Sequence, residues 1–294
     1  MSRAAEPVPD AGPDTVVDAH VHVPRLSTLK PAWLEWADRF SGPHPWRDAY
    51  DDAGDPVPER FDALLAAEGV DRALLFCEYS PRATGIQPIE DLLPIVEYNP
   101  DRFRLVANVN PHLHHLLVRE VERQLDLGAV ALKLHPVHAG FSPADRDLYP
   151  VYAACSERGV PVITHSGTSD FPGSRARFGD PELYLDVIED FPELALVFAH
   201  GGRGWWYDTA AFLALGRPNV WLDLAGLPPH KLPEYYARFD VTRLATKFIF
   251  GTDWPGVPGT ARNVAALRKL GLPDDVLRDV LSGNAAKVFP GLGI

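Results

Sequence analysis

The chain has 294 residues, of which 46% are hydrophobic, so it is long enough to bury a large core. Its formal net charge of -12, from 40 acidic and 28 basic residues, repels phosphate backbones and anionic lipid, which argues against nucleic acid and membranes as partners. The two cysteines both lie in apolar runs, so we expect no disulfide framework and a reducing, cytoplasmic location.

The first 14 residues, MSRAAEPVPDAGPD, are rich in proline, alanine and acid and lack the apolar stretch of a secretory signal. We expect a short disordered leader there, followed by one domain over residues 15–294. No apolar run approaches the length of a membrane-spanning helix.

Eight short apolar runs alternate with amphipathic helical stretches along the rest of the chain. Nearly continuous apolar runs are typical of parallel strands that are covered on both faces. The expected strands are residues 16–21, 71–77, 103–109, 129–134, 161–165, 194–200, 219–224 and 247–253. Gly69, Gly128 and Gly159 stand between a helical stretch and the next strand, where glycine commonly ends a helix.

Eight strands that alternate with helices fit either a closed (β/α)8 barrel or an open doubly wound sheet. An open sheet should carry a glycine-rich phosphate loop after its first strand. Here the first strand runs into DAHVHVP instead. The sequence therefore predicts a single α/β domain of the (β/α)8, or TIM-barrel, class.

Residues 24–60 interrupt the alternation, directly after the first strand. They contain Trp33, Trp36 and Trp46, and they leave the barrel on the face where such folds place their active sites. We interpret this insertion as a partial lid over the pocket. The alternative is a solvated loop, in which three tryptophans would be unusual.

Titratable residues end four of the expected strands. His20 and His22 are two residues apart at the end of the first strand, so both side chains point to the same face. His165 ends the fifth strand, His200 the sixth and Asp253 the eighth. Strand-end residues of this kind are typically catalytic in a barrel, and imidazoles with a carboxylate suit zinc or another first-row divalent ion. The alternative is that each histidine is a core residue bonded to backbone.

The run DAHVH, the two later strand-ending histidines and the run FGTDWP together resemble the amidohydrolase superfamily. Within it, the chain is similar to the amidohydrolase-related branch, also called amidohydrolase family 2. That branch contains hydrolases and non-oxidative decarboxylases such as aminocarboxymuconate-semialdehyde decarboxylase. The resemblance spans nearly the whole chain, from the first strand to GNAAKVF near the end.

The resemblance implies one divalent metal ion, Zn²⁺ or alternatively Mn²⁺, bound by His20, His22, His165 and Asp253. It also implies that His200 stays unligated beside the ion, where it polarises the substrate or transfers protons. Asp253 would have a second task, which is to accept a proton from water activated by the ion.

Lys133 ends the fourth strand, and His135 follows two residues later on the same face. In binuclear members of the superfamily a carbamylated lysine at this strand bridges two metals, and a histidine of the sixth strand binds the second. The resemblance therefore also admits Lys133 and His200 as ligands of a second ion. We favour one ion, with Lys133 as a cation facing the pocket. His135 could orient a ligand, contact substrate or simply pack.

Aromatic residues and one arginine follow the strand ends that carry the expected site. Arg203 and Trp206 come after the sixth strand, and Trp254 follows Asp253 directly. With His135 we expect them to contact a small planar substrate that bears a carboxylate. The alternative is that the tryptophans pack helices onto the barrel.

These residues favour hydrolysis of an ester, lactone or amide-like bond by metal-activated water. The alternative is non-oxidative decarboxylation of an aromatic or dienoic acid on the same site, and a non-catalytic binding barrel comes third. A homodimer is compatible with this fold, although no segment indicates an interface.

Several further polar residues have no single assignment. Asp18 either accepts a hydrogen bond from a ligand histidine or caps backbone, and Asp223 has the position of a pocket residue without a task. We expect a solvated run at His112, His114 and His115, and we leave His44 and His138 open.

Overall fold

The computed structural model describes residues 15–293, so the leader predicted for residues 1–14 lies outside the described residues. Eight parallel strands follow one another around a single sheet, in the order β1-β2-β5-β6-β7-β8-β9-β10. Their bounds are β1 Val17–Val21, β2 Arg72–Phe76, β5 Phe103–Asn108, β6 Ala129–Leu134, β7 Val162–Gly167, β8 Leu196–Arg203, β9 Val220–Asp223 and β10 Phe248–Ile249.

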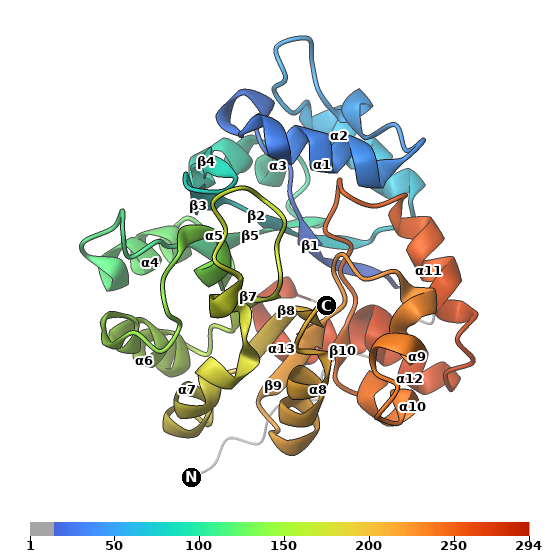
Figure 1. Cartoon of the computed structure of the whole chain (residues 1–294). Helices are drawn as coiled ribbons and strands as arrows, with labels where there is room; N and C mark the ends of the chain where they lie inside the picture. The colour runs from blue at the N-terminus through green and yellow to red at the C-terminus, as the bar shows by residue number, and fades with distance from the viewer. Residues whose placement is uncertain (1–14, 294) are drawn as a thin grey trace.

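The two ends of the sheet meet, which makes the sheet a nearly closed barrel (Figure 1). The N–H of Ala19 donates to the carbonyl of Phe250 at 3.0 Å, and the N–H of His22 donates to that of Trp254 at 2.9 Å. Val21 and Trp254 form a parallel bridge across the same seam. The predicted (β/α)8 TIM barrel is confirmed.

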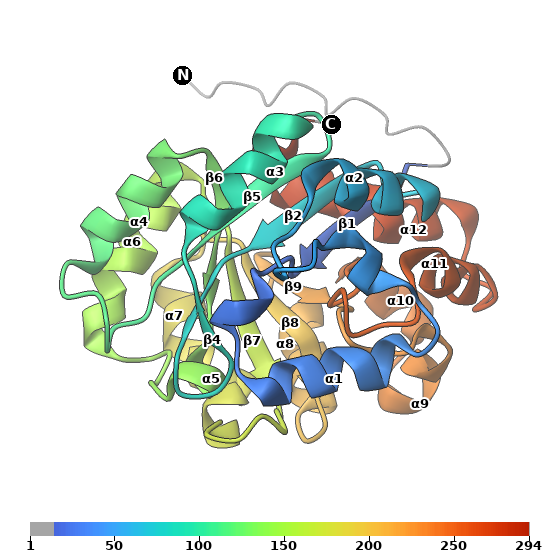
Figure 2. The ribbon, with the colours of Figure 1, turned by 90° about the horizontal axis from the view of Figure 1, so that it is seen from above.

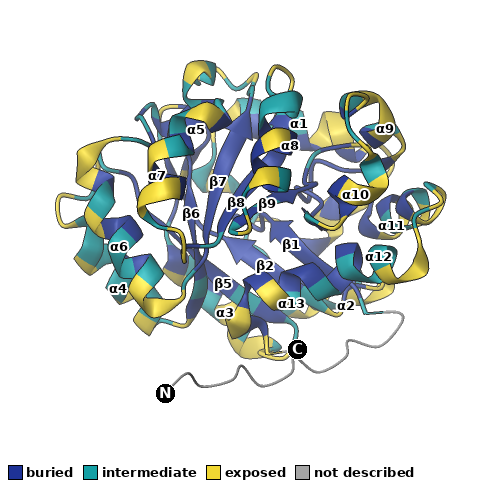
Figure 3. Ribbon diagram, turned by 90° about the horizontal axis from the view of Figure 1, so that it is seen from below, coloured by how far each residue is buried: buried dark blue, intermediate teal, exposed yellow. Residues whose placement is uncertain are grey.

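Helices surround the strands, and their exposed faces lie on the outside (Figure 3). The longer ones are α1 Pro31–Ser41, α2 Pro58–Ala67, α4 Leu117–Asp126, α6 Tyr149–Arg158, α8 Tyr207–Gly216 and α11 Thr260–Arg268. The shorter ones are α3 Leu93–Tyr98, α5 Pro136–Ala139, α7 Leu185–Asp190, α9 Leu232–Tyr235, α10 Val241–Ala245, α12 Asp274–Arg278 and α13 Asn284–Val288. Within the described part of the chain, no helix has the length and apolar character needed to cross a membrane.

The apolar runs form strands because both of their faces are buried. Side chains such as Val17, Leu74 and Val197 fill the barrel interior, while alternate residues such as Leu75 and Phe198 pack against the surrounding helices. Burial on both faces explains why these strands lack the polar–apolar alternation of half-exposed strands. The continuous hydrophobic pattern therefore located all eight strands, although β10 is much shorter than its apolar run.

The insertion after β1 contains the helix α1, which lies at the side of the barrel where β4 and α5 also lie (Figure 2). β3 (Glu78–Ser80) and β4 (Gly85–Gln87) form an antiparallel hairpin. The insertion is hydrogen-bonded to the loop of this hairpin, because the Lys30 N–H donates to the Thr84 carbonyl at 2.8 Å. Trp33 and Trp46 are buried, so the insertion is packed rather than solvated.

Candidate metal centre

Three of the predicted ligands converge at the barrel mouth. Nε2 of His22 lies 3.4 Å from Oδ1 of Asp253, and Nε2 of His20 lies 3.7 Å from the same oxygen. Two ligand atoms of a tetrahedral zinc ion, each about 2.0–2.1 Å from the metal, are separated by about 3.3 Å. The donor atoms of His20, His22 and Asp253 therefore have the chemistry and the spacing of a metal site.

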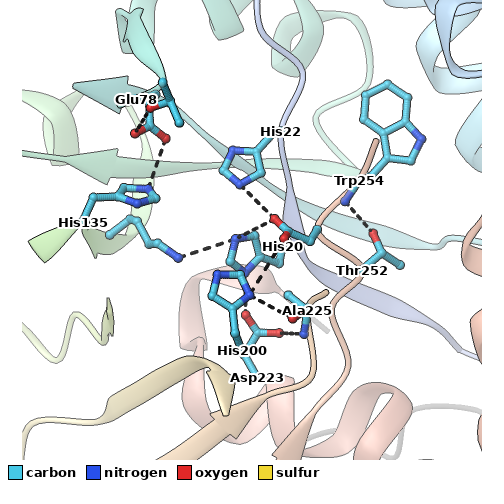
Figure 4. Close-up of polar contacts among 12 residues, drawn as sticks. His20, His22, Glu78, His135, His200, Asp223, Ala225, Thr252 and Trp254 are labelled. Atoms are coloured by element: carbon cyan, nitrogen blue, oxygen red, sulfur yellow. Dashed lines mark hydrogen bonds and ion pairs between the residues drawn. The ribbon is translucent and has the colours of Figure 1, made fainter. Parts of the chain in front are cut away.

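Asp223 fixes the orientation of the His20 ring (Figure 4). Nδ1 of His20 donates to Oδ2 of Asp223 at 2.5 Å, and Oδ1 of Asp223 accepts from the Ala225 N–H at 2.8 Å. Burial lowers the pKa of His20 well below its ordinary value, so the ring is neutral. Burial also raises the pKa of Asp223, while the nearby Lys133 opposes that shift. With its hydrogen on Nδ1, His20 presents the lone pair of Nε2 to the centre.

Asp253 is buried and ionised. Burial opposes ionisation, but His200, His22 and Arg203 outweigh it and hold the pKa of this carboxyl well below its usual range. Among residues 15–293, the non-glycine residues with positive φ are His200 (66°) and Asp253 (71°). Strained backbone of this kind clusters at functional sites, and here it turns both side chains toward the same point.

His200 is held in one tautomer by the backbone. Its Nδ1–H donates to the Ala225 carbonyl at 2.8 Å, and Nδ1 lies 3.9 Å from Oδ2 of Asp253. Burial, together with Arg203, lowers the pKa of His200 well below its ordinary value. The neutral ring therefore carries its hydrogen on Nδ1 and offers Nε2 as a proton acceptor, so it must be protonated before it can donate to a substrate oxygen.

His165 lies between two groups of histidines. Its ring centroid is 4.6 Å from that of His200 and 4.7 Å from that of His138. Its ligand atom belongs to a compact set with those of His135 and His138, in which all three lie within 4.8 Å of one another. His165 also lines the same inner cavity as His22 and Asp253, so it lies at the site to which the prediction assigned it.

Lys133 is fully buried in the barrel interior. Its Nζ lies 3.5 Å from Nε2 of His20 and 5.0 Å from the centroid of the Phe76 ring. Burial lowers the pKa of this ammonium to about 8, although Asp223 and Asp253 oppose the shift. The side chain therefore lies beside His20, although it lines neither of the two cavities described below.

Two adjoining cavities connect the site to solvent. An inner cavity of about 30 Å³ is lined by His22, His200 and Asp253, and an outer one of about 500 Å³ opens beyond it. Trp36, Phe171, Arg203 and Asp253 line both cavities. Since Trp36 belongs to α1, the insertion contributes to the wall of both cavities.

Two predicted substrate contacts lie elsewhere. Trp254 is fully buried, with its ring against Phe61 and Trp46, and neither it nor Trp206 lines the two cavities. The chain turns sharply at Asp253, so consecutive side chains point in opposite directions and Trp254 enters the core. The aromatic wall comes instead from Trp36 and Phe171.

Asp18 has a backbone role. Its carboxylate accepts from the Thr252 N–H at 2.9 Å and from the Thr252 hydroxyl at 2.7 Å, so it fixes the turn before Asp253. The acceptor for the ligand histidine is Asp223, to which the sequence assigned no task. Glu78, on the hairpin, was not singled out at all, and it faces His135 (Figure 4).

Comparisons with known proteins agree with this architecture. A family model described as amidohydrolase matches residues 17–291. The structure is similar to that of an uncharacterised TIM-barrel protein from Bordetella bronchiseptica, with 24% identity, 95% of this chain and 100% of that chain covered, and a TM-score of 0.77.

Two further solved structures share the fold. One is 5-carboxyvanillate decarboxylase from Sphingomonas paucimobilis, with 19% identity, 94% and 99% coverage of this chain and that chain, and a TM-score of 0.63. The other is a probable 2-pyrone-4,6-dicarboxylic acid hydrolase from Acinetobacter baumannii, with 15% identity, 94% and 99% coverage, and a TM-score of 0.60. These likenesses show a common barrel that serves both hydrolases and decarboxylases.

Proposed function

The chain belongs to the amidohydrolase family, and from this premise we propose that it is a metal-dependent hydrolase. Its substrate is a small aromatic or carboxylate-bearing molecule with an ester, lactone or amide-like bond. The observation that carries this proposal is the pairing of an ionised Asp253 with an unprotonated Nε2 of His200 beside the inner cavity. Two proton acceptors at one point suit the activation of water.

The donor set favours Zn²⁺ as the ion, held by His20, His22 and Asp253. Two imidazoles and a carboxylate are a common protein set for catalytic zinc, which leaves further positions to water and substrate. When bound, such an ion supplies Lewis acidity, which polarises a carbonyl group and makes water more acidic. His165, which the resemblance implies as a fourth ligand, lines the same inner cavity as His22 and Asp253.

The residues around the ion handle protons and position the substrate. Asp253 and His200 accept the proton that water gives up when it attacks the substrate carbonyl. His200, once protonated, donates to the oxyanion or to the leaving group. Arg203 lines both cavities and is placed to bind a substrate carboxylate, while Trp36 and Phe171 offer flat apolar faces for a ring.

Non-oxidative decarboxylation is the second candidate, and the position of Arg203 favours it. Nη1 of Arg203 lies only 3.9 Å from Oδ2 of Asp253, so an anchored carboxylate would lie against the site itself. Decarboxylation requires that the carboxylate to be lost lies at the site itself. Hydrolysis requires only that an anchoring carboxylate lies near the bond to be cleaved.

A product assay separates the two candidates. Zinc-loaded protein is incubated with aryl esters, lactones and anilides that carry a carboxylate, and separately with hydroxybenzoic and dienoic acids. We expect hydrolysis products and no carbon dioxide. Carbon dioxide from the acids without turnover of any ester, lactone or amide would refute the hydrolase proposal. Asp253→Asn must abolish the activity and Asp186→Asn, an exposed site on α7, must keep it, which excludes a contaminating esterase.

A further inference from the structure

A buried carboxylate and two histidines form part of the wall of the inner cavity. Glu78 belongs to β3, His135 follows β6 and His138 belongs to α5. All three residues are buried, with 5%, 3% and 5% of their surface exposed, and all three line the cavity. The metal centre described above uses none of them, so their role lies elsewhere.

The carboxylate of Glu78 is ionised and held in place (Figure 4). Its Oε1 accepts from the Thr84 hydroxyl at 2.9 Å, and its Oε2 lies 3.2 Å from Nε2 of His135. Burial opposes ionisation, but His135 and His138 outweigh it and hold the pKa of Glu78 well below its usual range. The wall therefore carries a fixed negative charge next to the His135 ring.

This charge decides where the hydrogen of His135 lies. Burial lowers the pKa of His135 well below its ordinary value, although Glu78 opposes the shift, so the ring is neutral and carries one N–H. A lone pair on Nε2 would face a carboxylate oxygen at 3.2 Å, and two acceptors at that distance repel each other. The hydrogen therefore lies on Nε2, and the lone pair lies on Nδ1.

Nδ1 of His135 is thus a buried acceptor in the wall of a substrate cavity. Within residues 15–293, no protein group donates a hydrogen bond to it. Buried polar atoms of native proteins are almost always satisfied. An unpartnered acceptor at this position indicates that the donor belongs to the molecule that enters the cavity.

His138 limits the rotation of the His135 ring. The two rings are nearly parallel, with centroids 5.0 Å apart and an interplanar angle of 14°. Nε2 of His138 lies 3.1 Å from the Ser169 hydroxyl, which accepts from the Ser174 hydroxyl at 3.2 Å. The stack is therefore anchored to the loop after β7, and Nδ1 of His135 keeps one place in the wall.

Glu78 and Arg203 attract different groups of a substrate. In the described part of the chain, the ion-pair contacts of Glu78 are with His135 and His138 and not with a lysine or arginine. A carboxylate without a fixed cation repels a second carboxylate, whereas Arg203, which lines the same cavity, attracts one. The group that meets His135 must therefore donate a hydrogen bond without being an anion, and a hydroxyl group meets both conditions.

We propose that Glu78, acting through His135, makes the enzyme selective for a substrate that carries a hydroxyl group in addition to its carboxylate. Nδ1 of His135 accepts the hydroxyl hydrogen. Glu78 is the positioning residue that keeps this nitrogen an acceptor. The inference rests on the proposed function, since it takes the substrate to be a small carboxylate-bearing molecule anchored at Arg203.

Paired probes test the proposal on the zinc-loaded, full-length protein. Each of 3-hydroxybenzoate and 4-hydroxybenzoate is compared with the fluorobenzoate of the same substitution pattern, because fluorine is similar in size to a hydroxyl group but donates no hydrogen bond. Isothermal titration calorimetry gives the dissociation constants. We expect the better-placed hydroxybenzoate to bind roughly tenfold more tightly than its fluoro partner, as for a hydrogen bond to an otherwise unpaired buried acceptor.

Glu78→Gln tests the role of the carboxylate. The Thr84 hydroxyl should donate to the amide oxygen, which turns the amide NH₂ toward Nε2 of His135 and moves the ring hydrogen to Nδ1. The preference for the hydroxyl group should then disappear, while the fluorobenzoates bind as before. A merely structural role would weaken both members of a pair alike. His135→Phe, which keeps a ring but has no nitrogen, should lose the preference as well.

Glu193→Gln makes the same substitution at an exposed position and should keep the wild-type preference. Circular dichroism shows whether each variant is folded, and Glu78→Gln decides the question if His135→Phe unfolds. Metal-free protein should show the same preference, and its loss without zinc would assign the hydroxyl group to the ion and overturn the proposal.

Two further results would overturn it. One is that neither hydroxybenzoate binds more tightly than its fluoro partner in the wild type. The other is that the preference survives in Glu78→Gln. The probes contain no ester, lactone or amide bond, so their binding is measured without turnover. Failure of the hydrolase assay would therefore leave this result readable by itself.

Discussion

The hydrogen bond between His20 and Asp223 decides which nitrogen of the ring faces the centre. Asp223→Asn keeps the shape of the side chain but allows its amide to donate to Nδ1, which would move the ring hydrogen to Nε2. Nε2 could then bind a metal only after losing that hydrogen. We expect zinc affinity at the metal centre to fall by about 10–100-fold, measured by competition with a chelating dye.

The control for this change is Asp186→Asn, the same substitution at an exposed position. Unaltered zinc affinity in Asp223→Asn would show that Asp223 does not orient His20. Thermal unfolding of the metal-free variant separates a loss of fold from a loss of affinity, because an oriented ring matters only when the ion is present.

Arg203 is the cation that both cavities share. Removing a charge-assisted hydrogen bond costs about 1.5–3 kcal/mol, which corresponds to roughly a tenfold to a hundredfold rise in KM. We therefore expect Arg203→Ala to raise KM for a carboxylate substrate and to leave KM for the matching methyl ester nearly unchanged. Steady-state kinetics on the two substrates make the test, and equal effects on both would remove Arg203 from carboxylate binding.

The positions of residues at strand ends could be predicted from the sequence, whereas their contacts with distant residues could not. His20, His22 and Asp253 were predictable because parallel strands deliver their ends to one mouth. Glu78 and Asp223 acquire their roles through contacts across more than 50 residues of sequence, which no local pattern encodes. The HPVH run at 135–138 did carry a signal, since it places two histidines within one helical turn.

At the scale of elements, the position of α1 depends on its close approach to the loop after β10. Trp36 packs so tightly on Gly256 that a Cβ at this glycine would lie 2.1 Å from Cζ2 of the indole. The Trp36 ring also contacts Phe171, at a centroid distance of 5.7 Å and an interplanar angle of 67°. Three separate segments therefore form the cavity wall, and its shape depends on how the Trp36 side chain packs between the other two.

Glu68 joins the end of α2 to the start of α11. Its Oε1 accepts from Nε2 of His44 at 2.9 Å, and its Oε2 accepts from the Ala261 N–H at 2.7 Å. The His44 hydrogen bond, more than any other contact, lowers the pKa of this partly buried carboxyl below its ordinary value of 4.5. A folded-state pKa below the unfolded value means that the contribution is present above about pH 4.5 and is lost as the pH falls through the folded-state pKa.

We expect Glu68→Gln to lower the free energy of unfolding by about 1 kcal/mol at pH 7, a value reduced by solvent screening. Urea titrations at pH 7 and at pH 4 measure the change. The difference from the wild type should shrink at the lower pH, since a protonated glutamic acid resembles glutamine. Glu193→Gln, at an exposed position, serves as the control, and a pH-independent difference would contradict the ionic origin.

Element positions were predictable to within a few residues, apart from the last strand. The run 247–253 is apolar enough for a full strand, yet β10 comprises only Phe248 and Ile249. Asp18 binds the backbone and hydroxyl of Thr252 and draws the chain out of the sheet before Asp253. A tertiary hydrogen bond thus overrides the local propensity at the position where the site needs a turn.

At the scale of the whole molecule, the metal centre lies on the seam that closes the barrel. His20 belongs to β1, His22 follows it directly and Asp253 follows β10, so their shared ion would link the two ends of the sheet. With β10 so short, the seam has few backbone bonds of its own, among them the Asp253 N–H donating to the His20 carbonyl at 2.9 Å. Metal binding should therefore stabilise the entire fold and not only the local site.

Removal of metal tests this coupling. An ion present at about 1,000 times its Kd stabilises the folded state by about 4 kcal/mol, which for a domain of this size corresponds to roughly 5–10 °C in Tm. We expect chelated protein to melt lower than zinc-saturated protein by that amount, with full recovery when zinc is restored. His22→Ala should show a clearly smaller shift, because the seam has lost one of its ligands. If chelation left Tm unchanged while zinc was shown to have departed, the barrel would close without the ion, and the backbone bonds between Ala19 and Phe250 and between His22 and Trp254 would suffice to hold the seam.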